Sequence, residues 1–98
     1  MVFDDIANFT DEEIQMILNE TDRKHWEVGL KGGSKELQDR IFGVVGEEEA
    51  PAMKKGMDYA GPTKMSKVEY VQITIVQKVL QLEQDGKLEI PREKDPFV

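Results

Sequence analysis

Apolar residues recur along this chain at intervals of three and four, which is the spacing of an α-helix that buries one face. The period of two that is typical of a half-buried strand is almost absent. We therefore predict an all-α fold, in which five or six amphipathic helices form one compact bundle. A chain of 98 residues suits a single domain of this kind and leaves no room for a second core.

Capping residues and glycines mark the helix boundaries. The start signals are, in chain order, a capping box of Thr10 and Glu13, then Asp22, then Ser34, and a second capping box of Ser66 and Glu69. The stop signals are Lys31-Gly32-Gly33, Gly46, Gly61-Pro62 and Gly86. The helix after Ser66 is the longest, so we expect it to be the central packing element. Phe3 and Ile6 predict a further short helix or helical turn at the start.

The segment 47–59 is the weakest expected helix. Pro51 cannot donate a backbone hydrogen bond, so the helix should start near Pro51 or bend there. Gly56 lies inside the same segment and costs about 1 kcal/mol of helix stability relative to alanine. Beyond the last helix we expect a short extended segment over 87–90 and a charged tail over 91–98, which gives a domain of residues 1–90.

Three methionines leave two interpretations open. Met53, Met57 and Met65 lie in or just after the weak segment and either fill the core or form a soft adhesive patch. Because Pro51 and Gly56 leave the orientation of this segment open, the sequence does not decide between the two.

Composition restricts the compartment and the partners. The absence of cysteine favours a reducing cytosol. No apolar run approaches the roughly 18 residues of a membrane span and the N-terminus has no basic segment, so neither secretion nor membrane insertion is expected. Twenty acidic residues against 13 basic ones give a formal net charge of -7, which disfavours binding to nucleic acid.

No residue pattern predicts catalysis or a cofactor. The only histidine, His25, has no catalytic partner nearby in the sequence, so we expect it on the surface or at its boundary. The acidic runs Asp4-Asp5 and Glu47-Glu48-Glu49 lack the alternating oxygen ligands and glycine of a calcium loop. The chain is therefore expected to be neither an enzyme nor a metal or cofactor protein, and to act through its charged surface.

A set of short motifs resembles the C-terminal domain of FliG, the flagellar motor switch protein. The motifs are Phe3-Asp4-Asp5-Ile6, Ile14-Gln15 with Leu18, Gly29-Leu30-Lys31-Gly32, Gly61-Pro62, Lys67-Val68-Glu69, and Leu82-Glu83 with Gly86. The resemblance covers nearly the whole chain. It implies an armadillo-like helical bundle at the flagellar basal body, on the cytoplasmic face of the inner membrane, with no cofactor. The implied partners are the stator protein MotA, through a charged ridge that serves torque and switching, and the rotor proteins FliM and neighbouring FliG subunits.

The resemblance also implies which residues form the charged ridge: Lys31, Glu48, Lys55 and Lys64. Lys31 keeps the family's lysine, and Lys64 matches the sign of the family's arginine. Glu48 stands where the family usually has an arginine, and Lys55 and Gly56 stand where it has adjacent aspartates. Two signs are thus reversed and one charge is lost.

Two alternatives remain beside a stator-facing rotor domain. One is a structural paralogue that packs into the rotor without a role in torque. The other is a magnesium-sensing helical domain, similar to the regulatory region of magnesium transporters, with Glu47-Glu48-Glu49 as ligands.

Overall fold

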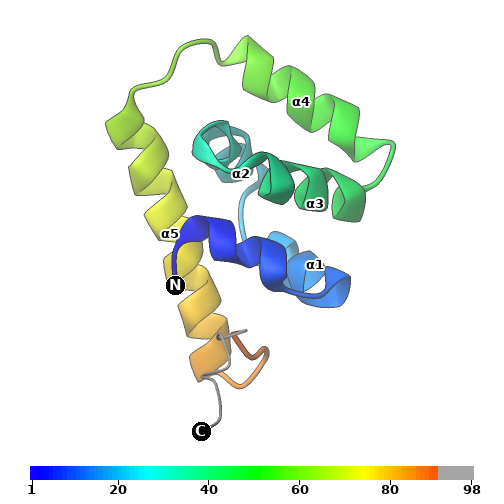
Figure 1. The fold of residues 1–98 in the computed structure, drawn as a ribbon, viewed down its shortest axis with the longest axis vertical. Helices are drawn as coiled ribbons and strands as arrows, with labels where there is room; N and C mark the ends of the chain where they lie inside the picture. Colours follow the sequence, from blue (N-terminus) through cyan, green and yellow to red (C-terminus); the bar gives the residue numbers. More distant parts are fainter. Residues whose placement is uncertain (91–98) are drawn as a thin grey trace, which may run out of the picture.

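The computed structural model describes residues 1–90 and, over that range, consists of helices and their connections without a β-strand (Figure 1). The elements are η1 (Phe3–Asn8), α1 (Asp11–Asn19), α2 (Arg23–Gly29), η2 (Leu30–Gly32), α3 (Lys35–Val45), α4 (Glu49–Tyr59) and α5 (Met65–Gln84), where η denotes a 3-10 helix. The predicted all-α fold is confirmed. The predicted tail over 91–98 lies outside the described residues.

Helix α5 runs along one side of the molecule and the other elements stack beside it (Figure 1). Helix α4 lies at one end of this stack, the α2–α3 pair lies in the middle, and η1 with α1 lies below. Helix α2 packs against both α4 and α5, and α3 packs against α4, α1 and η1. The α4–α5 loop connects α4, at the top of the view, to the upper end of α5.

The core forms where α5 meets the stack. Every third or fourth residue of α5 is buried, and the buried set is Val68, Val71, Ile75, Val79 and Leu82. Trp26 of α2 is fully buried, with its ring centroid 5.6 Å from that of Phe3 and its Nε1 donating to Thr21 Oγ1 over 2.7 Å. The one polar atom of this large side chain is therefore satisfied inside the core.

Helix starts follow the predicted caps with one exception. Thr10 and Glu13 form the reciprocal capping box of α1, with the Glu13 N–H donating to Thr10 Oγ1 over 3.2 Å. Asp22 caps α2 and Ser34 caps α3, also as predicted.

The capping box predicted at Ser66 is wrong. Helix α5 begins at Met65, after Lys64, and Lys64 caps it without a side-chain bond. The Lys64 carbonyl already accepts the N–H groups of Lys67 and Val68, over 3.0 and 3.1 Å. Ser66 is therefore helical and lacks the extended backbone that a capping serine needs.

Pro51 is the third residue of α4, where its missing N–H would have no partner within the helix in any case. The helix thus starts near Pro51, as one of the two predicted possibilities required. The methionines divide: Met53 is buried and Met57 packs against the core, whereas Met65 is 65% exposed.

Helix α5 is followed, after its C-cap Asp85, by a glycine in the left-handed region, Gly86, whose φ is 73°. The N–H of Lys87 donates to the Leu82 carbonyl and that of Gly86 to the Glu83 carbonyl, which is the bond pattern of a Schellman cap. The segment 87–90 that follows has no regular secondary structure and buries Leu88 and Ile90 against the core.

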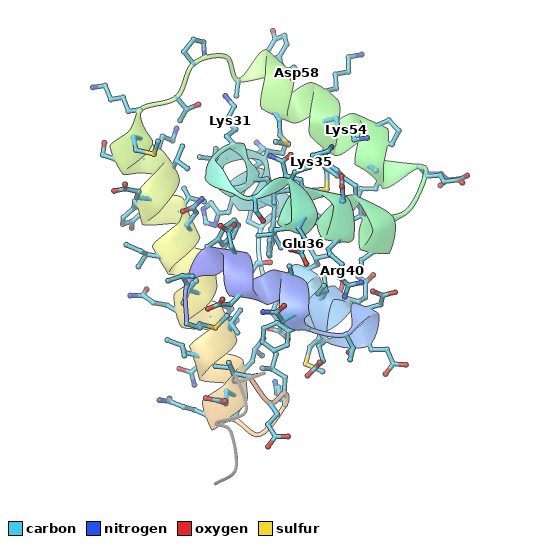
Figure 2. The ribbon with its side chains drawn as sticks, in the orientation of Figure 1. Lys31, Lys35, Glu36, Arg40, Lys54 and Asp58 are labelled. Atoms are coloured by element: carbon cyan, nitrogen blue, oxygen red, sulfur yellow. The ribbon has the colours of Figure 1, made fainter. Side chains whose placement is uncertain are left out.

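Arg40 of α3 ties the middle layer to the layer below it. Its guanidinium donates to the backbone carbonyls of Ala7 and Phe9 and pairs with the Asp11 carboxylate. Figure 2 shows Arg40 extending from α3 toward the start of α1. This one side chain therefore fixes the connection between η1 and α1.

Candidate interaction surface

The outer face of α4 carries two of the predicted ridge residues. Glu48 has a helical backbone just before α4, and Lys55 follows seven residues later, so the two share one helix face about two turns apart. Both are exposed. Ala50 and Met53 occupy the opposite, buried face. The ridge on α4 therefore shows an acid near the helix start and a base toward its end.

The other two ridge residues lie at the α4–α5 loop. Lys64 is exposed at the start of α5. Lys31 is half-buried beneath the loop, and its Nζ donates to the Gly61 carbonyl and, over 3.0 Å, to Thr63 Oγ1. Figure 2 shows Lys31 pointing up toward this loop. Glu48, Lys55 and Lys64 are thus free to meet a partner, whereas the Lys31 ammonium holds the loop that presents Lys64.

Helix α2 and η2 fix α4 at both of its ends. Arg23 and Lys31 lie eight residues apart, a spacing that puts them on one side of the helical run. Arg23 Nε pairs with the Glu49 carboxylate at the start of α4, and its Nη1 donates to the Leu18 carbonyl over 2.7 Å. Lys31 holds the backbone just past the other end of α4. No local sequence pattern indicates this role of Arg23, because its partner Glu49 lies 26 residues away.

A second charged surface lies between α3 and α4. The Nζ atom of Lys54 lies 4.9 Å from the centroid of the Phe42 ring, within the range of a cation–π contact. Lys35 and Asp39 of α3 form an ion pair at 3.7 Å beside a shallow pocket of about 290 Å³ that Asp58 also lines. Figure 2 shows Lys35 and Lys54 between the two helices. This surface carries both signs and was not predicted.

The structure does not bring together the residues that were considered for catalysis or metal binding. His25 is exposed, and of the acidic run Glu47-Glu48-Glu49 the third carboxylate is paired with Arg23. Within residues 1–90, no group of three or more histidine, aspartate or glutamate side chains is arranged to hold a metal ion. Among the same residues, no helix combines the length and the apolar character needed to cross a membrane.

The fold and the surface together define a small domain that is all-helical over residues 1–90 and presents exposed charged side chains. Comparison with known sequences identifies the family. The chain belongs to the FliG C-terminal domain family, whose sequence profile matches residues 1–90. The resemblance seen in the sequence motifs is therefore confirmed.

Individual relatives agree with this assignment. The chain is 35% identical over 91 residues to the flagellar motor switch protein FliG of Thermotoga maritima, an alignment that covers 93% of this chain and 27% of that protein. It is 34% identical over 99 residues to FliG of Borreliella burgdorferi, covering 99% of this chain and 29% of that protein. The chain thus spans a little more than a quarter of the length of these relatives.

Solved structures share the fold. A FliG fragment from Helicobacter pylori superposes with a TM-score of 0.89 at 26% identity, over 93% of this chain and 40% of that one. Full-length FliG from Aquifex aeolicus superposes with a TM-score of 0.85 at 25% identity, over 91% of this chain and 28% of that one. The relatives from Thermotoga maritima and Borreliella burgdorferi are both named as flagellar motor switch proteins.

Proposed function

We propose that this chain is a component of the bacterial flagellar motor switch that presents the outer face of α4 and the start of α5 to the cytoplasmic loop of the stator protein MotA. Its family is that of a switch protein and not of enzymes. The observation that carries the proposal is the exposure of Glu48 and Lys55 on one face of α4, with Lys64 exposed just beyond the following loop.

The proposed contact works through charge. Glu48 and Lys55 are separated by about 10 Å along the helix axis, because seven residues each rise about 1.5 Å. Physiological salt screens the interaction between exposed charges beyond about 8 Å, so Glu48 and Lys55 interact with a partner as two separate local charges. Such charges speed association with a complementary partner and exclude partners of the wrong sign. The stator loop should therefore carry a base opposite Glu48 and an acid opposite Lys55.

Motility in the native host tests this proposal. The exchange Glu48→Lys with Lys55→Glu keeps the net charge and reverses the order of the two signs. We expect it to reduce swimming strongly, because each side chain then meets a like charge on the stator. The matched control is Lys87→Glu with Glu89→Lys, which exchanges two exposed charges beyond the far end of α5. Normal swimming of the α4 exchange variant would contradict a stator contact through this face.

A second candidate function is packing within the rotor, and an apolar groove favours it. The groove lies between the N-terminal segment and α5, encloses about 420 Å³, and includes Val2, Ile73, Val76 and Leu80 among its lining residues. Val2 is 66% and Ile73 56% exposed. Contiguous exposed apolar surface of this kind often marks a protein interface. On this reading a neighbouring FliG subunit or FliM covers the groove, and the chain lacks a torque role.

The two candidates are separated by what the chain captures and by what its deletion does. A stator-facing domain should retain the MotA loop in a pull-down, and its deletion should impair swimming. A paralogue that only packs into the rotor should retain rotor proteins alone, and its deletion should leave motility normal. Either role places the chain at the basal body on the cytoplasmic face of the inner membrane, which a fluorescent fusion would test.

The magnesium-sensing alternative gains nothing from the observed geometry. It requires the carboxylates of Glu47-Glu48-Glu49 to converge on one ion, but Glu49 pairs with Arg23 and Glu48 lies on the outer face of α4. Calorimetry with magnesium remains its test, and heat at millimolar ion would restore it.

A further inference from the structure

Gly56 leaves a gap in α4 that a carboxylate fills. A Cβ atom added at Gly56 would lie within 2.5 Å of Cδ and Oε1 of Glu27, which is closer than non-bonded atoms approach. The Glu27 carboxylate, which extends from α2, therefore occupies the space in which any other residue at position 56 would start its side chain. Glycine is a poor helix former, yet Gly56 lies inside α4. It stands at the position where any side chain would displace the Glu27 carboxylate.

Glu27 is the middle residue of a row of three charges. Arg23, Glu27 and Lys31 follow each other at intervals of four and all meet α4 or the loop after it. Arg23 is paired with Glu49, and Lys31 holds the loop backbone. Glu27 makes no hydrogen bond or ion pair with any of residues 1–90, although it is half-buried. A carboxylate partly withdrawn from water is stabilised by a cation, and the two nearest cations in the row are engaged elsewhere.

We propose that Glu27 is an acidic contact residue of the surface formed by α4, and that its carboxylate, lodged beside Gly56, pairs with a lysine or arginine side chain of the partner. This inference rests on the proposed stator contact and extends it. Lys55 is exposed on the outer face of α4, and Gly56 lies about 100° further round the helix, on the flank that meets α2. The partner that fits this flank carries an acid opposite Lys55 and a base beside it opposite Glu27.

Calorimetric titration of the whole chain with the MotA cytoplasmic loop of the same host tests the inference. A second probe is the same loop with its lysines and arginines replaced by glutamine. We expect Glu27→Gln to weaken binding to the natural loop about tenfold, in line with the loss of a charge-assisted contact. The weakening should shrink at high salt and vanish with the substituted loop, because only the natural loop offers a cation. Glu89→Gln, which removes an equal charge beyond α5, should bind as the unaltered chain does.

Gly56→Ala supplies an independent variant. Its methyl group displaces the Glu27 carboxylate while alanine favours the helix, so the variant should stay folded and still bind about as weakly as Glu27→Gln. Unchanged affinity in both variants would overturn the inference. If Lys55→Glu abolishes binding while Glu27→Gln does not, the stator contact stands and only the role of Glu27 fails. If the unaltered chain does not bind the loop, the proposed function fails with it.

Discussion

Gly32→Ala should destabilise this protein strongly, because η2 approaches α5 too closely for a methyl group. A Cβ atom at Gly32 would lie 2.7 Å from Val68 Cγ1 and 2.9 Å from Gln72 Nε2. Val68 is only 4% exposed, and its β-branched side chain has one preferred rotamer in a helix. Gln72 is also held, since its Nε2 donates to the Gly29 carbonyl over 2.9 Å.

The magnitude follows from these two contacts. Overpacking a well-packed site costs about 1–3 kcal/mol, and displacing the Gln72 side chain forfeits a hydrogen bond worth about 1 kcal/mol. We therefore expect Gly32→Ala to lower the free energy of unfolding by about 2–4 kcal/mol. In a domain of this size each kcal/mol shifts Tm by roughly 4–8 °C, so Tm should fall by about 10–30 °C.

Thermal and urea unfolding followed by circular dichroism at 222 nm measure this change. The matched control is Gly43→Ala on α3, where a Cβ atom would meet nothing within 4 Å. Because alanine is the better helix former, this control should raise stability by about 0.5–1 kcal/mol. A Gly32→Ala variant whose Tm equals or exceeds that of the unaltered chain would refute the close approach of η2 to α5. The position of Lys31 beneath the α4–α5 loop would then be wrong as well.

Three further predictions concern the scaffold and the apolar groove. Arg40→Lys should lower the free energy of unfolding by about 1–2 kcal/mol in urea titrations, because lysine cannot reproduce the forked contacts of the guanidinium. Thr10→Ala should cost about 1 kcal/mol in the same assay through loss of the α1 cap, and a variant as stable as the parent would argue against that cap. Ile73→Glu combined with Leu80→Glu should leave Tm within a few degrees of the parent, since both side chains are exposed, yet abolish coprecipitation with rotor proteins. Retained coprecipitation would remove the groove as a rotor contact.

The helices were predictable because their signals are local. The caps at Thr10, Asp22 and Ser34 act within three residues of their positions, so the sequence displays them directly. Pro51 fits the first turn of α4 for an equally local reason. The predicted start of α5 is wrong because serine is a favoured capping residue, whereas the N-cap in the structure is Lys64 and Ser66 already lies inside the helix.

The site was only partly predictable because its decisive contacts join distant segments. The motif resemblance correctly suggested the family, and it placed Glu48, Lys55 and Lys64 on positions that prove to be exposed. Nothing in the sequence shows that the ammonium of Lys31 is engaged, since the loop it binds lies 30 residues away. The same holds for Gly56. The motif resemblance shows only that this position lacks the family's aspartate, whereas in the structure the Glu27 carboxylate occupies the space beside it.

The proposed stator contact can be tested most directly by cross-linking, because the chain has no native cysteine. Lys55→Cys and, as a control on the exposed surface of α1, Glu12→Cys would be introduced separately into the host. Each would be paired with single cysteines along the cytoplasmic loop of the stator and oxidised in intact cells. We predict disulfide-linked adducts from position 55 and none from position 12. Adducts that form equally from both positions, or from position 12 alone, would contradict a stator contact through the outer face of α4.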